Sequence, residues 1–471
     1  MERIETDLCI IGGGSGGLSL AAGAVQMGAR VVLVEGHRMG GDCLNYGCVP
    51  SKALLAAARA AQAMRSGGAF GVTPVEPEVD YAAAQDHVAR TIAAIAPHDS
   101  VERFEALGVR VIQAWGRFVS ETELEAGDHV IAARRFVVAT GSSPFVPPIP
   151  GLDGVPYLTN ETLFGLRERP AHLLVIGGGP IGLEMAQAHR RLGARVTVIE
   201  AERALGREDP EMAAPVLAKL REEGVEIVEE KAVTRVSGRA GAITVETSGG
   251  SHTGTHLLVA VGRRPNLDRL NPGAAGVEVS RAGIRVDAGL RSTNRRIYAI
   301  GDAAGGAQFT HVAGYHAGVV IRSILLGLPA KAREGHIPRV TYTDPELAQV
   351  GLTEAEARAR HGEKLTVARF DFAGNDRAVA GGGAEGLIKV MVVKGRPVGA
   401  SIAGPEAGEL IGLWALALAN GLKMGAVANM VAPYPTLGEV NKRAAGNYFS
   451  PKLFGNPWVK RVVRLVQRAI P

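Results

Sequence analysis

Residues 7–36 read DLCIIGGGSGGLSLAAGAVQMGARVVLVEG, and residues 172–201 read HLLVIGGGPIGLEMAQAHRRLGARVTVIEA. Both stretches contain an apolar strand, IGGGxxGL, a segment of helical period, GAR, a second apolar strand and an acidic residue. One glycine-rich turn is weak evidence for a nucleotide site. Here a strand before the turn, a helix after it and an acid about 20 residues on all occur twice. The sequence therefore predicts two copies of one dinucleotide-binding unit.

Each residue of the repeated motif has its own physical role. The first glycine permits the tight turn, the second lets the backbone approach a pyrophosphate, and the third lets the helix pack closely on the strand. The acidic residue can accept hydrogen bonds from ribose hydroxyls. The residues concerned are Gly12, Gly14, Gly17 and Glu35 in the first copy and Gly177, Gly179, Gly182 and Glu200 in the second.

The two units are expected to hold different nucleotides. The first unit runs directly into a segment with two cysteines, so it should hold a redox cofactor that exchanges electrons with them. The second unit should then hold the nicotinamide nucleotide. Glu200 can bond a free 2′-hydroxyl and repels a 2′-phosphate, which favours NADH over NADPH. Arg203 and Arg207 follow closely in sequence and weaken the expected preference for NADH.

Composition limits the class of protein. The 471 residues are 46% hydrophobic and 21% charged, which excludes a disordered chain, and three cysteines exclude a disulfide-stapled secreted scaffold. The net charge of +5 comes from interleaved basic and acidic residues, so no nucleic-acid partner is expected. No apolar run approaches the roughly 20 residues of a membrane span. A strand pattern begins by Thr6 and leaves no room for a signal peptide, so we expect a cytoplasmic protein.

The cysteine segment GGDCLNYGCVPSK (residues 40–52) places four residues between Cys43 and Cys48. In a protein of the reducing cytosol such a pair is metal-binding or redox-active more often than structural. Further Cys or His ligands at zinc spacing are missing nearby, so no metal site is expected. The helix start after the pair and Lys52 would both stabilise a thiolate. Cys9, inside the first strand, is expected to be an inert core thiol.

GGDCLNYGCVPSK resembles the redox motif of the FAD-dependent pyridine-nucleotide disulfide oxidoreductases, which include dihydrolipoamide dehydrogenase, glutathione reductase and mercuric reductase. The resemblance covers nearly the whole chain. Four further segments carry it: VVATGSSP (137–144), VAVGRRPN (259–266), IYAIGDAA (297–304) and YTDPELAQVG (342–351). It implies FAD in the first unit, with Asp302 bonded to the ribityl chain. It also places around the cofactors Gly41, Asp42, Thr140, Gly141, Gly262, Arg263 and His311.

The resemblance also implies a path for electrons. They would run from NADH through FAD to a Cys43–Cys48 disulfide and on to an external acceptor. Cys48 would be the thiol next to the flavin, and Cys43 would exchange with the substrate. Lys52 and Glu184 match the ion pair that the family places beside the flavin and the nicotinamide.

The expected fold is α/β, with two Rossmann-like three-layer domains, for FAD and NAD(P), and a C-terminal α+β dimerisation domain that makes a homodimer. The domain boundaries are expected to be 1–150 (FAD, first part), 151–270 (NAD(P)), 271–335 (FAD, second part), 336–450 (interface) and 451–471 (basic amphipathic tail).

One departure from the family concerns the acid/base residue. Most members carry a His–Pro–Thr segment near the C-terminus, and its histidine serves the partner subunit's exchange thiol. Here Tyr434 stands in place of that histidine, with Glu439 five residues on. A tyrosine hydroxyl titrates near ~10 and is a poor base, which handicaps the oxidation of a dithiol such as dihydrolipoamide. Simple packing of Tyr434 at the interface is the other interpretation.

Tyrosine at this place, together with GREDPE (206–211) and GPEAGELI (404–411), resembles the mercuric-reductase branch. However, the vicinal C-terminal cysteines that usually deliver Hg(II) are missing, since the chain ends VRLVQRAIP. Three hypotheses for the acceptor therefore stay open. In the first, the enzyme acts on a small or protein-bound disulfide, including the dihydrolipoamide type of reaction. In the second, it reduces Hg(II). In the third, it is an electron-transfer subunit docked to a membrane or partner protein by its basic tail.

Two further features allow more than one interpretation. Asp42 stands where the family usually has threonine, and it could raise the pKa of Cys43, point to solvent or cap the following helix. The tail, residues 452–471, is basic without an acid and has apolar residues along one helix face. It could lie on an anionic membrane or on a partner. It could also be a terminal helix docked on the dimer, which we favour.

Overall fold

The first nucleotide unit is built on a sheet whose central strands are parallel. The structure is a computed structural model that describes residues 1–470. The strand order is β3–β2–β1–β6–β5–β4, and β18 also pairs with β6. Helices α1 (Ser15–Gln26) and α9 (Thr310–Leu326) pack together over one face. The strands are β1 (Glu2–Ile11), β2 (Val31–Val34), β3 (Arg110–Ile112), β4 (Gly116–Phe118), β5 (Glu123–Ala126), β6 (His129–Val138) and β18 (Ile297–Ala299).

The second unit repeats this construction in a smaller sheet of order β10–β9–β8–β14, all parallel. An antiparallel sheet of β11 to β13 packs beside it, and the two share an apolar core that includes Leu174, Val236 and Val245. Its elements are β8 (His172–Ile176), α7 (Pro180–Arg191), β9 (Arg195–Ile199), α8 (Pro210–Glu222), β10 (Val225–Val228), β11 (Val233–Arg239), β12 (Ala242–Thr247), β13 (Gly250–Gly254) and β14 (His256–Val259).

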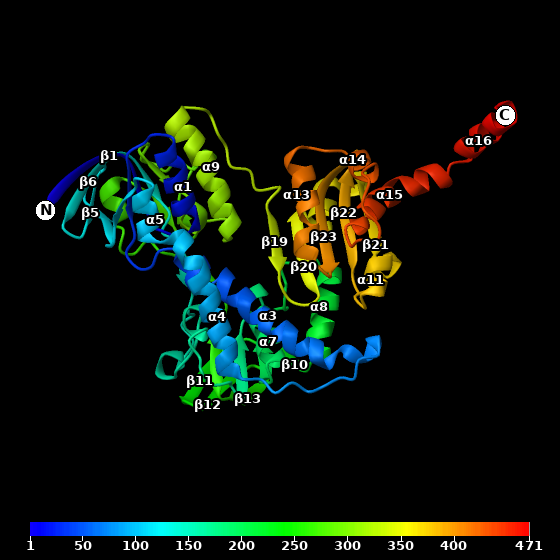
Figure 1. Cartoon of the computed structure of the whole chain (residues 1–471), viewed down its shortest axis with the longest axis horizontal. Helices are drawn as coiled ribbons and strands as arrows, with labels where there is room; N and C mark the ends of the chain where they lie inside the picture. Colours follow the sequence, from blue (N-terminus) through cyan, green and yellow to red (C-terminus); the bar gives the residue numbers. More distant parts are fainter. Residues whose placement is uncertain (471) are drawn as a thin grey trace.

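Two long helices join the nucleotide units. Helix α3 (Cys48–Arg65) leaves the first unit and runs over the second, antiparallel to α4 (Tyr81–Ile95), as Figure 1 shows. Buried Leu54 and Ala58 of α3 belong to the same core as Leu183 of α7. The helix that begins with Cys48 is therefore packed against the second unit.

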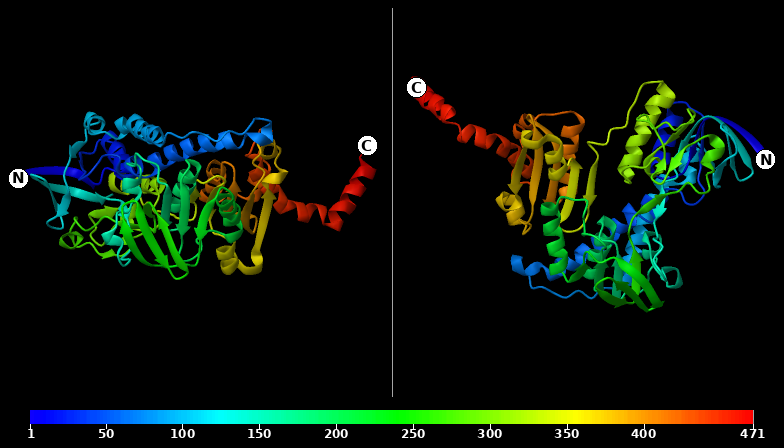
Figure 2. Two further views of the ribbon diagram at one scale, coloured as in Figure 1. Left: turned by 90° about the horizontal axis from the view of Figure 1, so that it is seen from below. Right: turned by 180° about the vertical axis from the view of Figure 1, so that it is seen from behind.

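The third body is an antiparallel sheet of order β19–β20–β23–β22–β21 with helices on one side (Figures 1 and 2). Trp414 is fully buried in its core, and its indole N–H donates to Asn441 Oδ1 at 2.7 Å. The strands are β19 (Pro338–Thr341), β20 (Glu346–Gly351), β21 (Leu365–Asp371), β22 (Leu387–Val393) and β23 (Arg396–Gly404). The helices are α10 (Glu354–His361), α11 (Asp376–Ala380), α12 (Ala407–Leu410), α13 (Gly412–Ala419) and α14 (Met424–Ala428).

A buried lysine ties the third body to the second unit. The Lys389 side chain on β22 is 2% exposed, and its Nζ lies 2.6 Å from Asp209 Oδ2 and 2.9 Å from Glu211 Oε2. Both carboxylates belong to the start of α8, and Glu354 of α10 completes the cluster at 2.5 Å. The third body is thus held against the second unit by charge as well as by apolar contact.

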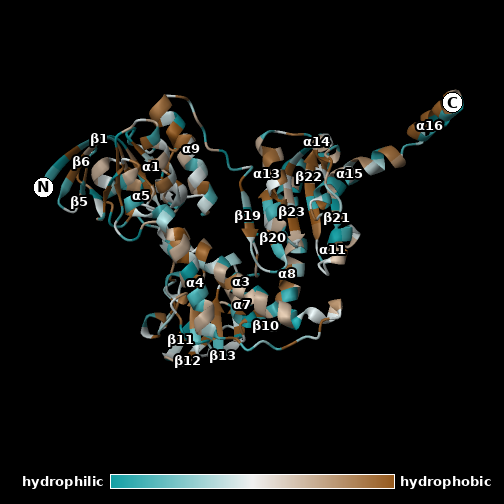
Figure 3. Cartoon of the chain, in the orientation of Figure 1, coloured by the Kyte–Doolittle hydropathy of each residue, from teal (hydrophilic) through white to brown (hydrophobic). Residues whose placement is uncertain are grey.

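The last two helices leave the body of the protein. Helix α15 (Glu439–Phe454) begins on the third body, and α16 (Pro457–Ala469) extends away from it (Figures 1 and 2). Hydropathy colouring shows apolar strands inside the three bodies, and both apolar and hydrophilic residues on α16 (Figure 3). Within residues 1–470 no helix is both long and apolar enough to cross a membrane.

Candidate functional site

The two glycine-rich turns have nearly the same geometry. Gly12 and Gly177 have φ values of +115° and +112°, a region in which a side chain is strained. A Cβ on Gly17 would lie 1.9 Å from the Gly12 carbonyl oxygen, and one on Gly182 would lie 2.0 Å from that of Gly177. The first glycine therefore makes the turn and the third allows the helix to approach the strand.

The two acidic residues also occupy equivalent places. Glu35 Oε2 accepts the N–H of Gly13 at 2.6 Å, and Glu200 Oε2 accepts that of Gly178 at 2.7 Å. Each carboxylate is thereby fixed at the end of its strand, beside the middle glycine of its turn. The second turn has open space beside its second motif glycine, because a Cβ added to Gly179 would meet no atom within 4 Å.

A cavity of about 850 Å³ starts at the first glycine turn and reaches the cysteines, α7 and the third body. It collects most of the residues expected around FAD and the redox pair. These are Gly12, Gly14, Glu35, Gly41, Asp42, Cys43, Cys48, Lys52, Thr140, Gly141, Glu184, Arg263, Asp302 and His311.

The cavity wall fits a bound dinucleotide. Thr140 Oγ1 is buried there and has no hydrogen-bond partner in the part of the chain that the structure describes. An unsatisfied buried hydroxyl is costly, and a polar ligand would satisfy it. Beside Gly14, the nearest atom to an added Cβ is the Gly41 Cα at 3.8 Å, so the backbone is accessible there. These residues fit FAD, with its pyrophosphate next to the first turn.

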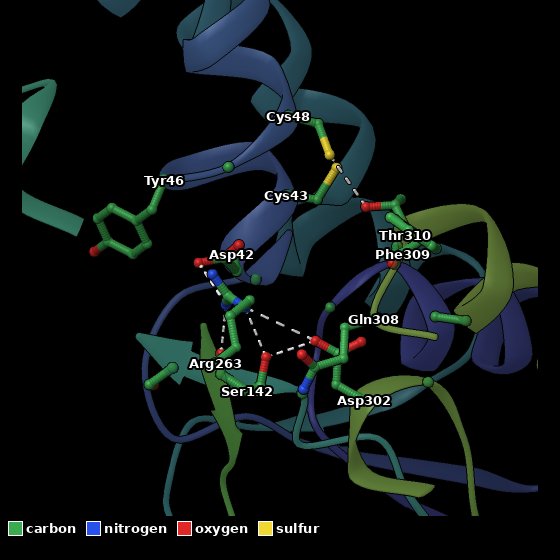
Figure 4. A pocket seen from close by; sticks show the side chains of 18 of the residues that line it. Asp42, Cys43, Tyr46, Cys48, Ser142, Arg263, Asp302, Gln308, Phe309 and Thr310 are labelled. Atoms are coloured by element: carbon green, nitrogen blue, oxygen red, sulfur yellow. Dashed lines mark hydrogen bonds and ion pairs between the residues drawn. The ribbon is translucent and has the colours of Figure 1, made fainter. Parts of the chain in front are cut away.

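A polar network lines the cavity below the cysteines (Figure 4). Ser142 donates to Asp302 Oδ2 at 2.5 Å and accepts from Arg263 Nε at 2.8 Å. Burial raises the pKa of Asp302. The Arg263 guanidinium lies 3.0 Å from Asp42 Oδ1, which also accepts from Asn160 at 3.0 Å. Asp42 is thus paired in the cavity wall, with its side chain 33% exposed.

The two cysteines predicted to be redox-active meet at the junction of two helices. Cys43 lies in α2 (Gly41–Asn45) and Cys48 begins α3, and their sulfur atoms face each other (Figure 4). Both are free thiols here, and Cys48 Sγ lies 3.3 Å from Thr310 Oγ1 at the start of α9. Cys9 is also free but fully buried, and burial raises its pKa, as expected of an inert core thiol.

The surroundings favour ionisation of Cys48 over Cys43. A hydrogen bond from Cys43, opposed by burial and supported by the Thr310 hydroxyl and the Lys52 charge, lowers the pKa of Cys48 to about 6. The same bond, burial and the neighbouring charge raise the pKa of Cys43. One thiolate therefore exists at neutral pH, at the N-terminus of α3, where a negative charge is favoured.

Lys52 and Glu184 form the expected ion pair, with Nζ 2.8 Å from Oε2. The Glu184 side chain is 6% exposed, and its Oε1 accepts the backbone N–H of Tyr342 at 3.0 Å. Lys52 Nζ also lies 4.3 Å from the centre of the Tyr342 ring. The pair therefore connects α3, α7 and the third body at the wall of the cavity.

The remaining predicted residues lie outside this cavity. Tyr434 is 68% exposed on the third body, and its hydroxyl donates to Asp376 Oδ2 at 2.8 Å. Glu439 begins α15, and its carboxylate is 3.9 Å from Arg443. The other predicted residues away from the cavity are Gly17, Gly177, Gly179, Gly182, Glu200 and Gly262.

Sequence reasoning missed several residues that contact the predicted ones. Ser142 and Tyr342 lie inside segments that carry the family resemblance, but their residue types alone do not indicate a place in the site. Asn160 and Thr310 belong to no such segment, and only the fold brings them to Asp42 and Cys48. The position of Thr310 directly before His311, at a helix start, was the available signal.

Comparison with known proteins agrees with this geometry. Residues 6–317 match the pyridine nucleotide-disulphide oxidoreductase family, and residues 337–445 match the dimerisation domain of that family. Dihydrolipoyl dehydrogenase of Bacillus subtilis is 36% identical, covering 92% of this chain and 96% of that protein. A mercuric reductase of Bacillus cereus is also 36% identical, covering 93% of this chain and 71% of that protein.

Among solved structures, a Cu(II) complex of RclA is similar throughout. RclA is an HOCl-induced flavoprotein disulfide reductase from Escherichia coli. The two chains are 29% identical with a TM-score of 0.83, over 92% of this chain and 98% of that one. The repeated nucleotide turns, the paired cysteines and these relatives lead to one conclusion: the chain belongs to the pyridine nucleotide-disulfide oxidoreductases and is an FAD-dependent enzyme that uses NAD(P)H.

Proposed function

We propose that this enzyme takes electrons from NADH and delivers them through Cys48 and Cys43 to an external oxidised acceptor, a disulfide or a thiophilic metal ion. The observation that carries the proposal is the contact of Cys48 with Thr310, opposite Cys43 and one helical turn from Lys52. This arrangement stabilises one thiolate and leaves a partner thiol beside it.

The chain's own residues have distinct parts in the reaction. Bound FAD supplies two-electron transfer between a hydride donor and a disulfide. Lys52 places a positive charge at the cavity wall, and Glu184 fixes the position of that charge. Thr310 and Cys43 hold the Cys48 thiolate by hydrogen bonds.

With a disulfide acceptor the exchange is balanced as follows. Two electrons and two protons break the Cys43–Cys48 bond and give two thiols. Cys43 then attacks one acceptor sulfur while its proton passes to the departing sulfur, which forms a mixed disulfide and releases one acceptor thiol. Cys48 attacks the Cys43 sulfur, which restores the intramolecular disulfide and releases the second thiol. The acceptor is reduced by the two electrons that the dinucleotide supplied.

Glu200 supports NADH as the donor. Its carboxylate is fixed on Gly178, where it can accept from a ribose hydroxyl and would repel a phosphate. Arg203, the cation nearest in sequence, faces Glu230 at 3.7 Å and is therefore partly neutralised. We expect a lower KM for NADH than for NADPH.

Tyr434 supports the reducing direction. The dimerisation domain is expected to form a homodimer in which Tyr434 and Glu439 of one subunit complete the site of the other. The bond to Asp376 raises the pKa of Tyr434 further above 10, so it cannot serve as a base at neutral pH. Reduction of an acceptor needs no base to deprotonate an incoming dithiol, whereas oxidation of dihydrolipoamide does.

The relatives supply the acceptors to test. Mercuric reductase acts on Hg(II) by name, and RclA was solved with Cu(II). Hg(II) prefers soft thiolate ligands, as does Cu(I), the one-electron reduction product of Cu(II), and Cys43 and Cys48 are the accessible thiols of this chain. Small and protein-bound disulfides are the other class.

An anaerobic NADH titration of the purified holoenzyme tests the electron path. Wild type should take up twice the electrons of Cys43→Ser and develop a long-wavelength thiolate–flavin band. Equal uptake by both proteins would remove the cysteines from the path. With coupling established, turnover should be compared for Hg(II), Cu(II), glutathione disulfide and lipoamide, with NADH and NADPH as donors.

A further inference from the structure

Helix α16 has no place in the three bodies of the chain. It extends away from the third body in every view (Figures 1 and 2). Across residues 451–470, Val459 alone is partly covered and every other residue is exposed. Nevertheless α16 is a regular helix whose N-terminus is capped, since Asn456 Oδ1 accepts the N–H of Trp458 at 2.9 Å.

The side chains of α16 separate into two faces. At about 100° per residue, the apolar residues fill one arc of roughly 160° and the polar residues fill the opposite arc. The apolar residues are Trp458, Val459, Val462, Val463, Leu465, Val466, Ala469 and Ile470. The polar residues are Lys460, Arg461, Arg464, Gln467 and Arg468.

The apolar face is exposed on the single chain. Trp458 is 71% exposed and Leu465 is 70% exposed. Phe454, at the end of α15, adds a further exposed aromatic ring to this end of the chain. A contiguous apolar surface of this kind on a water-soluble body marks an interaction site.

The charges on α16 indicate what its apolar face binds. The chain has no acidic residue after Glu439, whereas the polar face of α16 carries four cations. Arg461 and Lys460 are the cations nearest the apolar arc on its two sides, so their long side chains can reach phosphate while the apolar face is buried. Tryptophan is enriched at the boundary between hydrocarbon and headgroups. A helix with this pattern lies in the plane of an anionic bilayer surface.

We propose that α16 anchors the enzyme to an anionic lipid bilayer. The apolar face enters the boundary between headgroups and acyl chains, and the four cations bind lipid phosphates. The enzyme body remains in water beyond α15. This inference does not depend on which acceptor the enzyme reduces.

Vesicle co-sedimentation of the full holoenzyme tests the proposal. We expect binding to vesicles of phosphatidylglycerol and phosphatidylcholine, at least tenfold weaker binding to phosphatidylcholine alone, and weakening by salt. Leu465→Asp should reduce binding at least tenfold, and Arg464→Glu with Arg468→Glu should do the same. Arg281→Glu is the matched control, because it changes the same kind of exposed charge on the first unit and should bind as wild type.

Tryptophan fluorescence reports the orientation of the helix. The chain has three tryptophans, so Trp458→Phe identifies the signal of Trp458. Anionic vesicles should shift the emission of wild type to shorter wavelength and leave that of Trp458→Phe unshifted.

Two results would overturn the proposal. One is the absence of binding by the full chain, and the other is binding that Leu465→Asp does not weaken. Light scattering of Leu465→Asp distinguishes the membrane from a second copy of the chain as the binding partner of α16. If the variant no longer forms a dimer, α16 belongs to the contact between two copies. On our proposal the variant keeps the mass of wild type and its electron uptake in solution.

Discussion

Lys52 and Glu184, 132 residues apart in sequence, form a 2.8 Å ion pair at the point where all three bodies meet. Lys52 comes from the helix that begins with Cys48, and Glu184 comes from the first helix of the second unit. We expect Lys52→Met to slow flavin reduction by NADH about tenfold to a hundredfold, because a charge-assisted bond contributes about 1.5–3 kcal/mol. Stopped-flow absorbance of the flavin measures the rate.

Arg59→Met is the control for this prediction. It removes an exposed cation from the same helix, away from the cavity, and should leave the rate unchanged. Lys52→Arg should recover part of the loss. An unchanged rate in Lys52→Met would mean that the ion pair of Lys52 with Glu184 has only a structural role.

The hydroxyl of Thr310 should help to set the ionisation of Cys48. Thr310→Val removes the contact to Sγ at 3.3 Å, so the pKa of Cys48 should rise above about 6. Less thiolate would then be present at pH 7. Thiolate absorbance at 240 nm, followed against pH in the reduced protein, gives the value.

Two further variants test the cause of that shift. Cys43→Ala should raise the pKa of Cys48 more than Thr310→Val does, because the bond from Cys43 is the larger contribution. Thr310→Ser keeps a hydroxyl and should titrate as wild type. The opposite order of the two shifts would contradict this account of the site.

Replacing Tyr434 should open the oxidative direction. Tyr434→His supplies a group that titrates near neutral pH, and a general base contributes about 10²–10⁴-fold. We expect dihydrolipoamide oxidation with NAD⁺ to rise within that range. Tyr434→Phe, which loses the bond to Asp376 without gaining a base, should show no rise. If the rate of Tyr434→His equals that of wild type, the tyrosine does not limit the reaction.

The Lys389 cluster should hold the third body in place and make stability depend on pH. Lys389→Met leaves three carboxylates without their buried cation, which costs about 3–5 kcal/mol. Against the effect of burial, bonds from Lys389 and Arg358 lower the pKa of Glu354 to about 2. Its stabilising effect is thus complete above pH 4.5 and is lost as the pH falls toward 2.

Thermal midpoints at pH 7 and pH 3 check this prediction. The difference between wild type and Lys389→Met should narrow at the lower pH, because there the unfolded chain protonates Glu354 and part of the stabilising effect of its ionised form in wild type is lost. Lys364→Met removes an exposed lysine of the same body, and its thermal midpoint should equal that of wild type at both pH values. A difference that is constant with pH would show that Glu354 does not titrate with the cluster.

The sequence predicted those parts of the site that depend on local backbone geometry. The positive φ of Gly12 and Gly177 and the close helix approach at Gly17 follow from a motif that only glycine satisfies. The ion pair of Lys52 with Glu184 was predicted from resemblance to the family, and the structure contains it.

Contacts that depend on tertiary packing were not predictable. Thr310 reaches Cys48 because α9 packs beside α1, which no local pattern encodes. Of the three interpretations of Asp42, an effect of its charge in raising the pKa of Cys43 agrees with the structure, but pairing with Arg263, 221 residues away, was not among them. The Lys389 cluster was missed for the same reason, since a lysine in an apolar strand gives no sign of its distant partners.

The long helix that begins at Cys48 has a consequence for motion within the molecule. Its first residue, Cys48, carries the sulfur that faces Cys43, while its later turns are buried against the helix that follows the second glycine turn. Thermal displacement of the second nucleotide unit must therefore shift the reactive sulfur as well. The rate of thiol exchange should respond to whether the nicotinamide nucleotide is present, even when no electron is transferred.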